Sequence, residues 1–65
     1  MMYYAEFYKK NAGRLVKAVM TDGEIFTGEL FAYISAQDNE PDPESIIVGR
    51  TELFTHEIET VEVAV

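Results

Sequence analysis

Acidic side chains alternate along one short segment of this sequence, and their spacing is the first arrangement that suggests chemistry. The acids at every second position are Asp38, Glu40, Asp42 and Glu44. Hard cations such as Ca²⁺ bind several carboxylate oxygens, but the segment has neither the ligand spacing nor the glycine of an EF-hand loop. We therefore expect a solvated, charged loop and no metal site.

Few other residues could carry out a reaction. Cysteine is absent and His56 is the single histidine, so disulfides, thiolate sites and a zinc cluster are excluded. The sequence has no glycine-rich phosphate loop and no serine nucleophile motif. Nothing in it fixes the separation of two carboxylates or raises the pKa of one. We expect a binding protein rather than an enzyme, and no cofactor.

The composition is that of one small folded domain with a strong negative charge. The chain has 65 residues, 48% of them hydrophobic, and 12 acids against five bases give a formal net charge of -7. A domain of this size buries only about 60% of the surface that its unfolded chain exposes, so we expect self-association to add stability. No apolar run approaches the roughly 20 residues of a membrane span, and a signal peptide is not evident. We expect a cytoplasmic protein without membrane contact.

The bases are concentrated near the start of the chain. Lys9, Lys10, Arg14 and Lys17 fall within nine residues, whereas acids dominate after Asp22. Nucleic-acid affinity comes mainly from lysine and arginine side chains that displace counterions. The net charge therefore opposes RNA binding, while this basic segment favours it. Lysines at the end of a helix would also complement its negative pole.

The N-terminal aromatic residues predict a short helix at about 3–11. Tyr4, Phe7 and Tyr8 have i, i+3, i+4 spacing, and Gly13 suits a left-handed cap. We expect the aromatic residues Tyr3, Tyr4, Phe7 and Tyr8 to pack over the domain as a lid, the alternative being that they stack on bases. If these residues form a strand instead, the fold is a generic SH3-like barrel.

Two runs before the acidic segment have strand composition. The first, at 14–21, ends at Asp22-Gly23, a strong hairpin-turn signal. The second, at 24–36, is long for one strand, and Gly28 in its middle permits a sharp bend or a close approach of another backbone. We expect one bent strand that serves two walls of a barrel.

The remaining residues predict one long loop and three more short strands. Residues 37–45 form the loop, because two prolines and clustered acids preclude a helix and a sheet ladder. One helix and five strands predict a single all-β domain, a small closed or nearly closed barrel at about 14–65. The last strand leaves a valine-rich edge, and pairing of the fourth strand with the fifth strand of the next copy would close a ring. The expected strands contain Ile46–Val48, Leu53–Phe54 and Val61–Val65.

With the strands placed, the segment from Asp22 to Tyr33 resembles the first motif of the Sm-like proteins. That motif contains a turn glycine, a bend glycine, a core aliphatic residue and an aromatic residue. The segment from Leu53 to Val61 is similar to the second motif of the bacterial, Hfq-like members. The matching positions are Gly23, Gly28, Leu30 and Tyr33 in the first motif and Phe54, His56, Ile58, Thr60 and Val61 in the second.

The resemblance covers nearly the whole chain except the acidic loop, and it implies a strongly bent five-stranded Sm-like barrel that forms a homo-oligomeric ring. It also implies binding of single-stranded RNA without catalysis. In the family, a Lys-His pair and an aromatic platform contact RNA at the pore, and a basic patch lies on the rim. Stacking on such a platform contributes about 1 to 3 kcal/mol per base.

Several of these positions differ here. Thr55 replaces the lysine of the pair, and Ile34 and the acidic loop displace the aromatic platform. On the opposite, adenine-binding face, Val19 and Ile25 replace tyrosine and lysine. His56 remains from the pore pocket, where it would contact a base; the alternative is a strand-end histidine hydrogen-bonded to a neighbour. The candidate RNA contacts implied by the resemblance are His56, Lys9, Lys10 and Arg14.

Two functions follow from these observations. The first is an Sm-like ring that associates with single-stranded RNA through a degenerate site. The alternative is an acidic oligomeric module that does not bind RNA and that uses the loop at 37–45 to contact a basic protein. The two functions use different binding surfaces: the basic residues with His56 in the first, and the acidic loop in the second.

Overall fold

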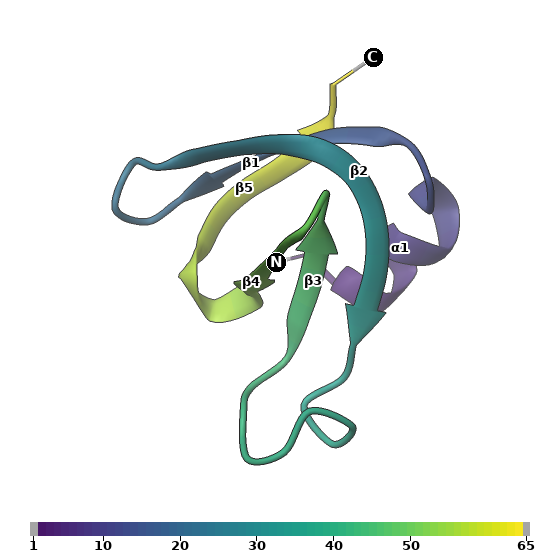
Figure 1. Ribbon diagram of the computed structural model, residues 1–65, viewed down its shortest axis with the longest axis vertical. Helices are drawn as coiled ribbons and strands as arrows, with labels where there is room; N and C mark the ends of the chain where they lie inside the picture. The colour runs from purple at the N-terminus through teal and green to yellow at the C-terminus, as the bar shows by residue number, and fades with distance from the viewer. Residues whose placement is uncertain (1, 65) are drawn as a thin grey trace.

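A computed structural model describes residues 2–64 and shows one short helix followed by five β-strands (Figure 1). A single turn of 3-10 helix, Thr55–Glu57, joins the last two strands. The predicted helix and strands are confirmed, although the last strand begins earlier than expected, at Ile58, and ends at Val63, while Val65 lies outside the described residues. The elements are α1 (Tyr4–Asn11), β1 (Leu15–Met20), β2 (Ile25–Ile34), β3 (Ser45–Val48), β4 (Thr51–Phe54) and β5 (Ile58–Val63).

The strands form one antiparallel sheet in the order β4-β3-β2-β1-β5. The predicted closure into a barrel is not observed, because no ladder joins β4 to β5 among residues 2–64. The 3-10 turn after Phe54 directs β5 towards β1, with which it pairs instead of β4. Both β4 and β5 therefore keep one edge without a sheet partner.

Strand β2 bends strongly and pairs with two different neighbours (Figure 1). Its first half, from Ile25 to Glu29, pairs with β1, and its second half, from Leu30 to Ile34, pairs with β3. A Cβ atom on Gly28 would lie 3.1 Å from the backbone nitrogen of Gly49, which donates a hydrogen bond of 2.7 Å to the carbonyl of Glu29. The predicted role of Gly28 in a close backbone approach is confirmed.

The connection between β1 and β2 is the tight turn predicted from Asp22-Gly23. Gly23 has a positive φ of 92°, which glycine adopts without the steric cost of a side chain. Its backbone nitrogen donates to the carbonyl of Met20 at 2.9 Å, and the backbone nitrogen of Glu24 donates to Oδ1 of Asp22 at 2.9 Å. These local hydrogen bonds close the hairpin, and the backbone nitrogen of Thr21 also donates to the carbonyl of Glu57 at 2.9 Å.

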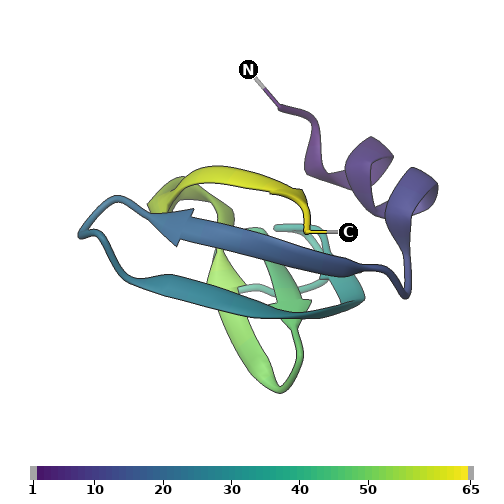
Figure 2. The same ribbon diagram turned by 90° about the horizontal axis from the view of Figure 1, so that it is seen from above.

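The hydrophobic core lies within the curved sheet, and α1 covers part of it from one side (Figure 2). Tyr4, Phe7 and Tyr8 pack against the core from the helix, which confirms the lid arrangement, whereas Tyr3 is exposed. Neither α1, with eight residues, nor any other helix in the described part of the chain is long and apolar enough to cross a membrane. The buried apolar residues are Val16, Ala18, Met20, Leu30, Ile46, Val48, Leu53, Ile58 and Val61.

The acidic loop ends one residue earlier than predicted, and its end is bound to the sheet. Ser45 is fully buried as the first residue of β3, so the predicted loop boundary at residue 45 is wrong. Its hydroxyl donates to Oε2 of Glu52 at 2.7 Å. The amide of Asn39 donates to the same carboxylate oxygen at 3.1 Å and to the carbonyl of Pro43 at 2.8 Å. A loop that looked fully solvated from its composition is therefore anchored by hydrogen bonds to β4.

Candidate binding surfaces

The basic residues proposed from the sequence lie at one end of α1. Lys9 and Lys10 are exposed in the last turn of the helix, and Arg14 is exposed immediately before β1. The backbone nitrogen of Arg14 donates to the carbonyl of Asn11 at 3.0 Å, which fixes the short connection between the helix and the strand. All three cations are exposed within residues 9–14, and we call these three residues the basic segment.

His56 lies in the turn between β4 and β5, and its side chain is 63% exposed. Its ring stacks near that of Phe54, with centroids 6.3 Å apart, and its Nε2 atom lies 3.9 Å from Oε2 of Glu57. It also lines a cavity of about 620 Å³, which we call the His56 cavity. The residues that line this cavity are Met2, Tyr4, Glu44, Thr55, His56, Ile58, Glu59, Thr60 and Val61.

The structure does not bring the four proposed RNA contacts into one site. The His56 cavity touches α1 at its start, through Tyr4, whereas Lys9 and Lys10 lie in the last turn. None of the residues lining the cavity is a lysine or an arginine, and Glu44 and Glu59 contribute carboxylates. A phosphate in this cavity would meet negative charge, so the cavity and the basic segment must be treated as separate surfaces.

The other residues of the two motifs lie in the core, at turns or on strands. Leu30 is fully buried and Ile58 is 7% exposed in the core, as expected of the aliphatic positions. Gly23 and Gly28 serve the turn and the close approach described above. Thr60 is exposed on β5, opposite Val19 on β1. These residues shape the strands that border the two surfaces.

Glu44 connects the ends of two strands through its carboxylate. The hydroxyl of Tyr33, near the end of β2, donates to Oε2 at 2.5 Å, and the hydroxyl of Thr55, after β4, donates to Oε1 at 2.6 Å. The backbone nitrogen of Thr55 donates to the carbonyl of Glu44 at 3.0 Å. Three hydrogen bonds thus hold the end of the acidic loop between two strands.

The same carboxylate affects two tyrosines. Its hydrogen bond to Tyr33, together with desolvation and the charges of Glu44 and Asp38, raises the pKa of Tyr33 to about 12. Burial raises the pKa of Tyr4, and the charge of Glu44 adds to this effect. The sequence placed Glu44 in a solvated loop, and no local pattern distinguished it from the other loop acids.

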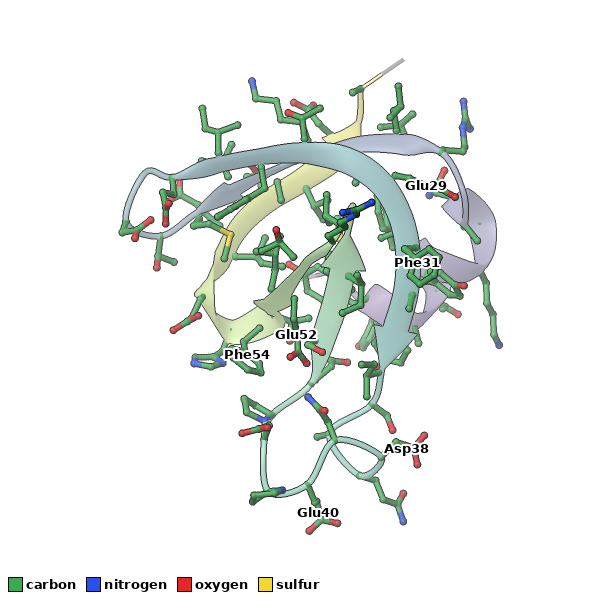
Figure 3. All side chains as sticks on the ribbon, viewed as in Figure 1. Glu29, Phe31, Asp38, Glu40, Glu52 and Phe54 are labelled. Carbon is green, nitrogen blue, oxygen red and sulfur yellow. The ribbon has the colours of Figure 1, made fainter. Side chains whose placement is uncertain are left out.

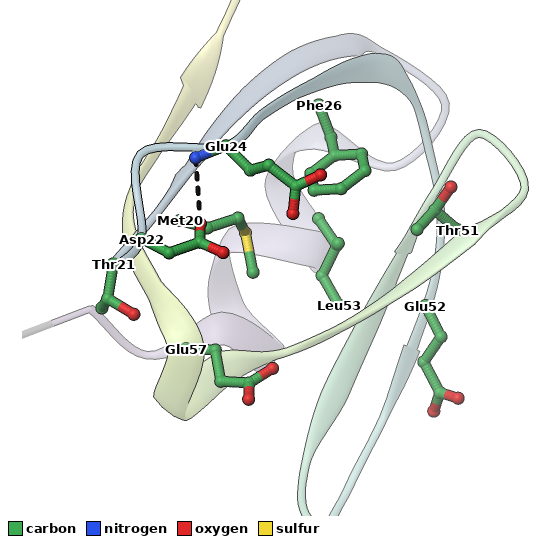
Figure 4. A pocket seen from close by; sticks show the side chains of 9 residues that line it. All are labelled: Met20, Thr21, Asp22, Glu24, Phe26, Thr51, Glu52, Leu53 and Glu57. Atoms are coloured by element: carbon green, nitrogen blue, oxygen red, sulfur yellow. Dashed lines mark hydrogen bonds between the residues drawn. The ribbon is translucent and has the colours of Figure 1, made fainter.

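A second cavity, which we call the acidic pocket, lies between the β1–β2 turn and β4 and has a volume of about 350 Å³ (Figure 4). The side chains of Met20, Phe26 and Leu53 point towards one another at its centre, with the carboxylates of Glu24 and Glu57 beside them. Sequence reasoning missed this site, because its members come from three separate segments: the first hairpin, β4 and the 3-10 turn. They are Met20, Thr21, Asp22, Glu24, Phe26, Thr51, Glu52, Leu53 and Glu57.

The alternating acids of the loop do not form a compact site. Figure 3 shows Asp38 and Glu40 on the loop that protrudes from the sheet, with their side chains directed away from it. Within residues 2–64, no group of three or more histidine, aspartate or glutamate side chains could hold a metal ion.

Comparisons with models of known protein families, with curated proteins and with solved structures find no match. The function must therefore be inferred from the geometry and charge of the chain itself.

Proposed function

We propose that this chain is a non-catalytic binding protein of the Sm-like type, and that its copies assemble into a ring through β4 and β5. The observation that carries the proposal is the pair of edges at opposite ends of one curved sheet, neither of which has a strand partner within residues 2–64. A free edge presents unpaired backbone N–H and C=O groups, which pair readily with another strand.

The positions of the two edges favour a closed assembly. When β4 of one copy pairs with β5 of the next, the pair again has one free β4 and one free β5. Such head-to-tail contacts repeat until the rotation closes a ring. Each edge strand is short, with four residues in β4 and six in β5. Closure of the ring would add a strand contact at both edges of every subunit and would thereby stabilise it.

Single-stranded RNA is the ligand we assign to this ring. Lys9, Lys10 and Arg14 form the exposed basic segment that would contact phosphates. A ring repeats this segment once per subunit, so weak contacts would act together. His56 would add a contact at its own cavity, against the unfavourable charge of Glu44 and Glu59.

A second candidate function is supported by the acidic loop. Asp38, Glu40 and Asp42 are exposed, and the hydrogen bonds of Asn39 hold the loop that carries them against β4. An acidic surface on a defined scaffold suits a basic protein partner. In this alternative the assembly is retained and RNA is not bound.

Native mass spectrometry at low ionic strength tests both parts of the proposal. The protein is measured alone and with a short uridine-rich or adenine-rich RNA. The expected result is a ring of definite subunit number that takes up RNA. A ring that ignores both RNAs would support the second candidate, and a monomer at all concentrations would contradict the assembly.

A pair of matched variants assigns the RNA surface. Lys10→Glu should weaken RNA binding about tenfold and reduce its salt dependence, because it replaces a phosphate-facing cation. Lys17→Glu makes the same charge change on β1, opposite Thr27 and Glu62, and should weaken binding less. Equal losses in both variants would show that net charge, rather than the basic segment, governs RNA binding.

A further inference from the structure

The acidic pocket combines an apolar floor with negative charge that the structure leaves unbalanced. Met20 and Leu53 are 7% and 4% exposed, and together with the half-buried Phe26 they form the floor. None of the residues that line the pocket is a lysine, an arginine or a histidine. A purely apolar ligand would cover the floor but would bury carboxylates without a partner, which is costly.

The carboxylates of the pocket have different amounts of freedom. Glu52 is directed away from the centre, and its Oε2 atom accepts hydrogen bonds from Ser45 and Asn39. Glu24 and Glu57 lie beside the floor, and Oε2 of Glu57 lies 3.9 Å from Nε2 of His56. Asp22 adds a third carboxylate. Its Oδ1 atom accepts a hydrogen bond from the backbone nitrogen of Glu24.

We propose that the acidic pocket binds a single arginine or lysine side chain, presented by an extended segment of a partner protein. The aliphatic stem of such a side chain would cover Met20, Phe26 and Leu53, and its cationic head would lie among Asp22, Glu24 and Glu57. Long basic side chains combine an apolar stem and a charged end in this way. The combination of floor and rim therefore selects this ligand over an apolar residue or an anion.

This inference goes beyond the proposed ring and its RNA. The acidic pocket and the His56 cavity share no residue. The basic segment precedes β1, whereas the β1–β2 turn follows it, and the basic segment contributes no residue to the pocket. The pocket also differs from the protruding loop of the second candidate function, because it has an apolar floor. Thr51, Glu52 and Leu53 of the pocket belong to β4, the edge assigned to the ring contact, so peptide binding is compared between dilute and concentrated protein.

The test uses the whole chain and a short peptide of serine and threonine with a central Val-Arg-Val, followed by methyl and amide NMR. The peptide should shift the methyl signals of Met20 and Leu53 and should saturate. Replacing the central arginine by glutamine should abolish the shifts. Replacing it by 2,3-diaminopropionate keeps the charge but removes most of the stem, and should weaken binding about tenfold, because each buried methylene contributes.

Two double variants with equal charge changes locate the site. Glu24→Gln with Glu57→Gln should weaken the arginine peptide about tenfold. Asp38→Asn with Glu40→Gln alters the protruding loop and should change binding by less than about twofold. Unchanged circular dichroism shows that each variant folds. If a variant does not fold, the peptide series on the unaltered protein decides whether the pocket binds a basic side chain.

Several results would overturn the proposal. Equal weakening by both double variants would mean that the peptide senses overall charge. Shifts confined to other methyl groups, or no saturable shift, would mean that the pocket does not bind the side chain. An adenine-rich RNA that shifts the same methyls and displaces the peptide would assign the pocket to nucleic acid. Shifts that grow with protein concentration alone would assign it to a second copy.

Discussion

Two acidic regions of this small protein use the same kind of side chain in opposite ways. At the end of the acidic loop, the carboxylates of Glu44 and Glu52 accept hydrogen bonds from Tyr33, Thr55, Ser45 and Asn39. In the acidic pocket, Glu24 and Glu57 lie beside an apolar floor without a lysine or an arginine among the lining residues. The first region holds strands together, and the second presents charge to a ligand.

The comparison shows that the number of acids says little about their function. What matters is the hydrogen-bond partner of each carboxylate, because a carboxylate bonded by hydroxyl groups stabilises the fold and an unbalanced one can bind a cation. Substitutions in the two regions should therefore have very different effects on stability.

The largest effect is expected at Glu44. Glu44→Ala removes the acceptor of both Tyr33 and Thr55 and should lower the free energy of unfolding by about 2 kcal/mol. Urea denaturation at neutral pH measures this loss. The matched variant Asp42→Ala, in the same loop, should change stability by less than about 0.5 kcal/mol. Similar losses in both variants would contradict the structural role of Glu44.

Ser45→Ala should give the next largest effect. Ser45 is fully buried, and its hydroxyl donates to Glu52 at 2.7 Å. Loss of this bond should cost about 1 kcal/mol. In a double-mutant cycle with Glu52→Gln, the two losses should be less than additive because the residues share one hydrogen bond. Strict additivity would show that the hydroxyl and the carboxylate do not interact.

Titration of Tyr33 tests the same region through pH. Its pKa in the folded protein is raised from 10.0 to about 12, so the stabilisation from its hydrogen bond to Glu44 is complete below pH 10 and is lost as the pH rises through 12. Absorbance near 295 nm should show this late ionisation. Glu44→Gln should move the midpoint down towards 10, and Tyr33→Phe should remove it. A midpoint that Glu44→Gln leaves unchanged would refute the assignment.

The smallest effect on stability is expected at the acidic pocket. Glu24→Gln combined with Glu57→Gln should leave the free energy of unfolding within about 0.5 kcal/mol of the original value, or raise it slightly, since both carboxylates are on a strongly negative surface. Added salt should reduce any increase. Thermal unfolding at low and high salt measures both. A loss above about 1 kcal/mol would mean that these acids hold the fold together.

The sequence predicted the backbone plan well, because the signals that determine it are local. Asp22-Gly23 marks a turn, Gly28 marks a bend, and the spacing of Tyr4, Phe7 and Tyr8 marks the helix and its packed face. Each of these depends on a few neighbouring residues, and the structure confirms each.

The binding surfaces could not be predicted in the same way. Tyr33 and Glu44 are separated by a loop, and the acidic pocket is assembled from the first hairpin, β4 and the 3-10 turn. Whether the sheet closes into a barrel also could not be predicted. Strand composition does not determine whether the turn after Phe54 places β5 alongside β4 or alongside β1. These features depend on the path of the chain between elements.

The bend in β2 has a consequence for the order of folding. The β1–β2 ladder closes around a turn of a few residues, with Val19 opposite Ile25, whereas the β1–β5 ladder joins Val16 to Val63, near the other end of the chain. Loop closure is faster and loses less entropy for the short connection. We expect the hairpin of β1 and β2 to form early. The second half of β2, from Leu30 to Ile34, would then act as a template on which β3 and β4 assemble. The strand that shapes the sheet would thus also order the steps of its formation.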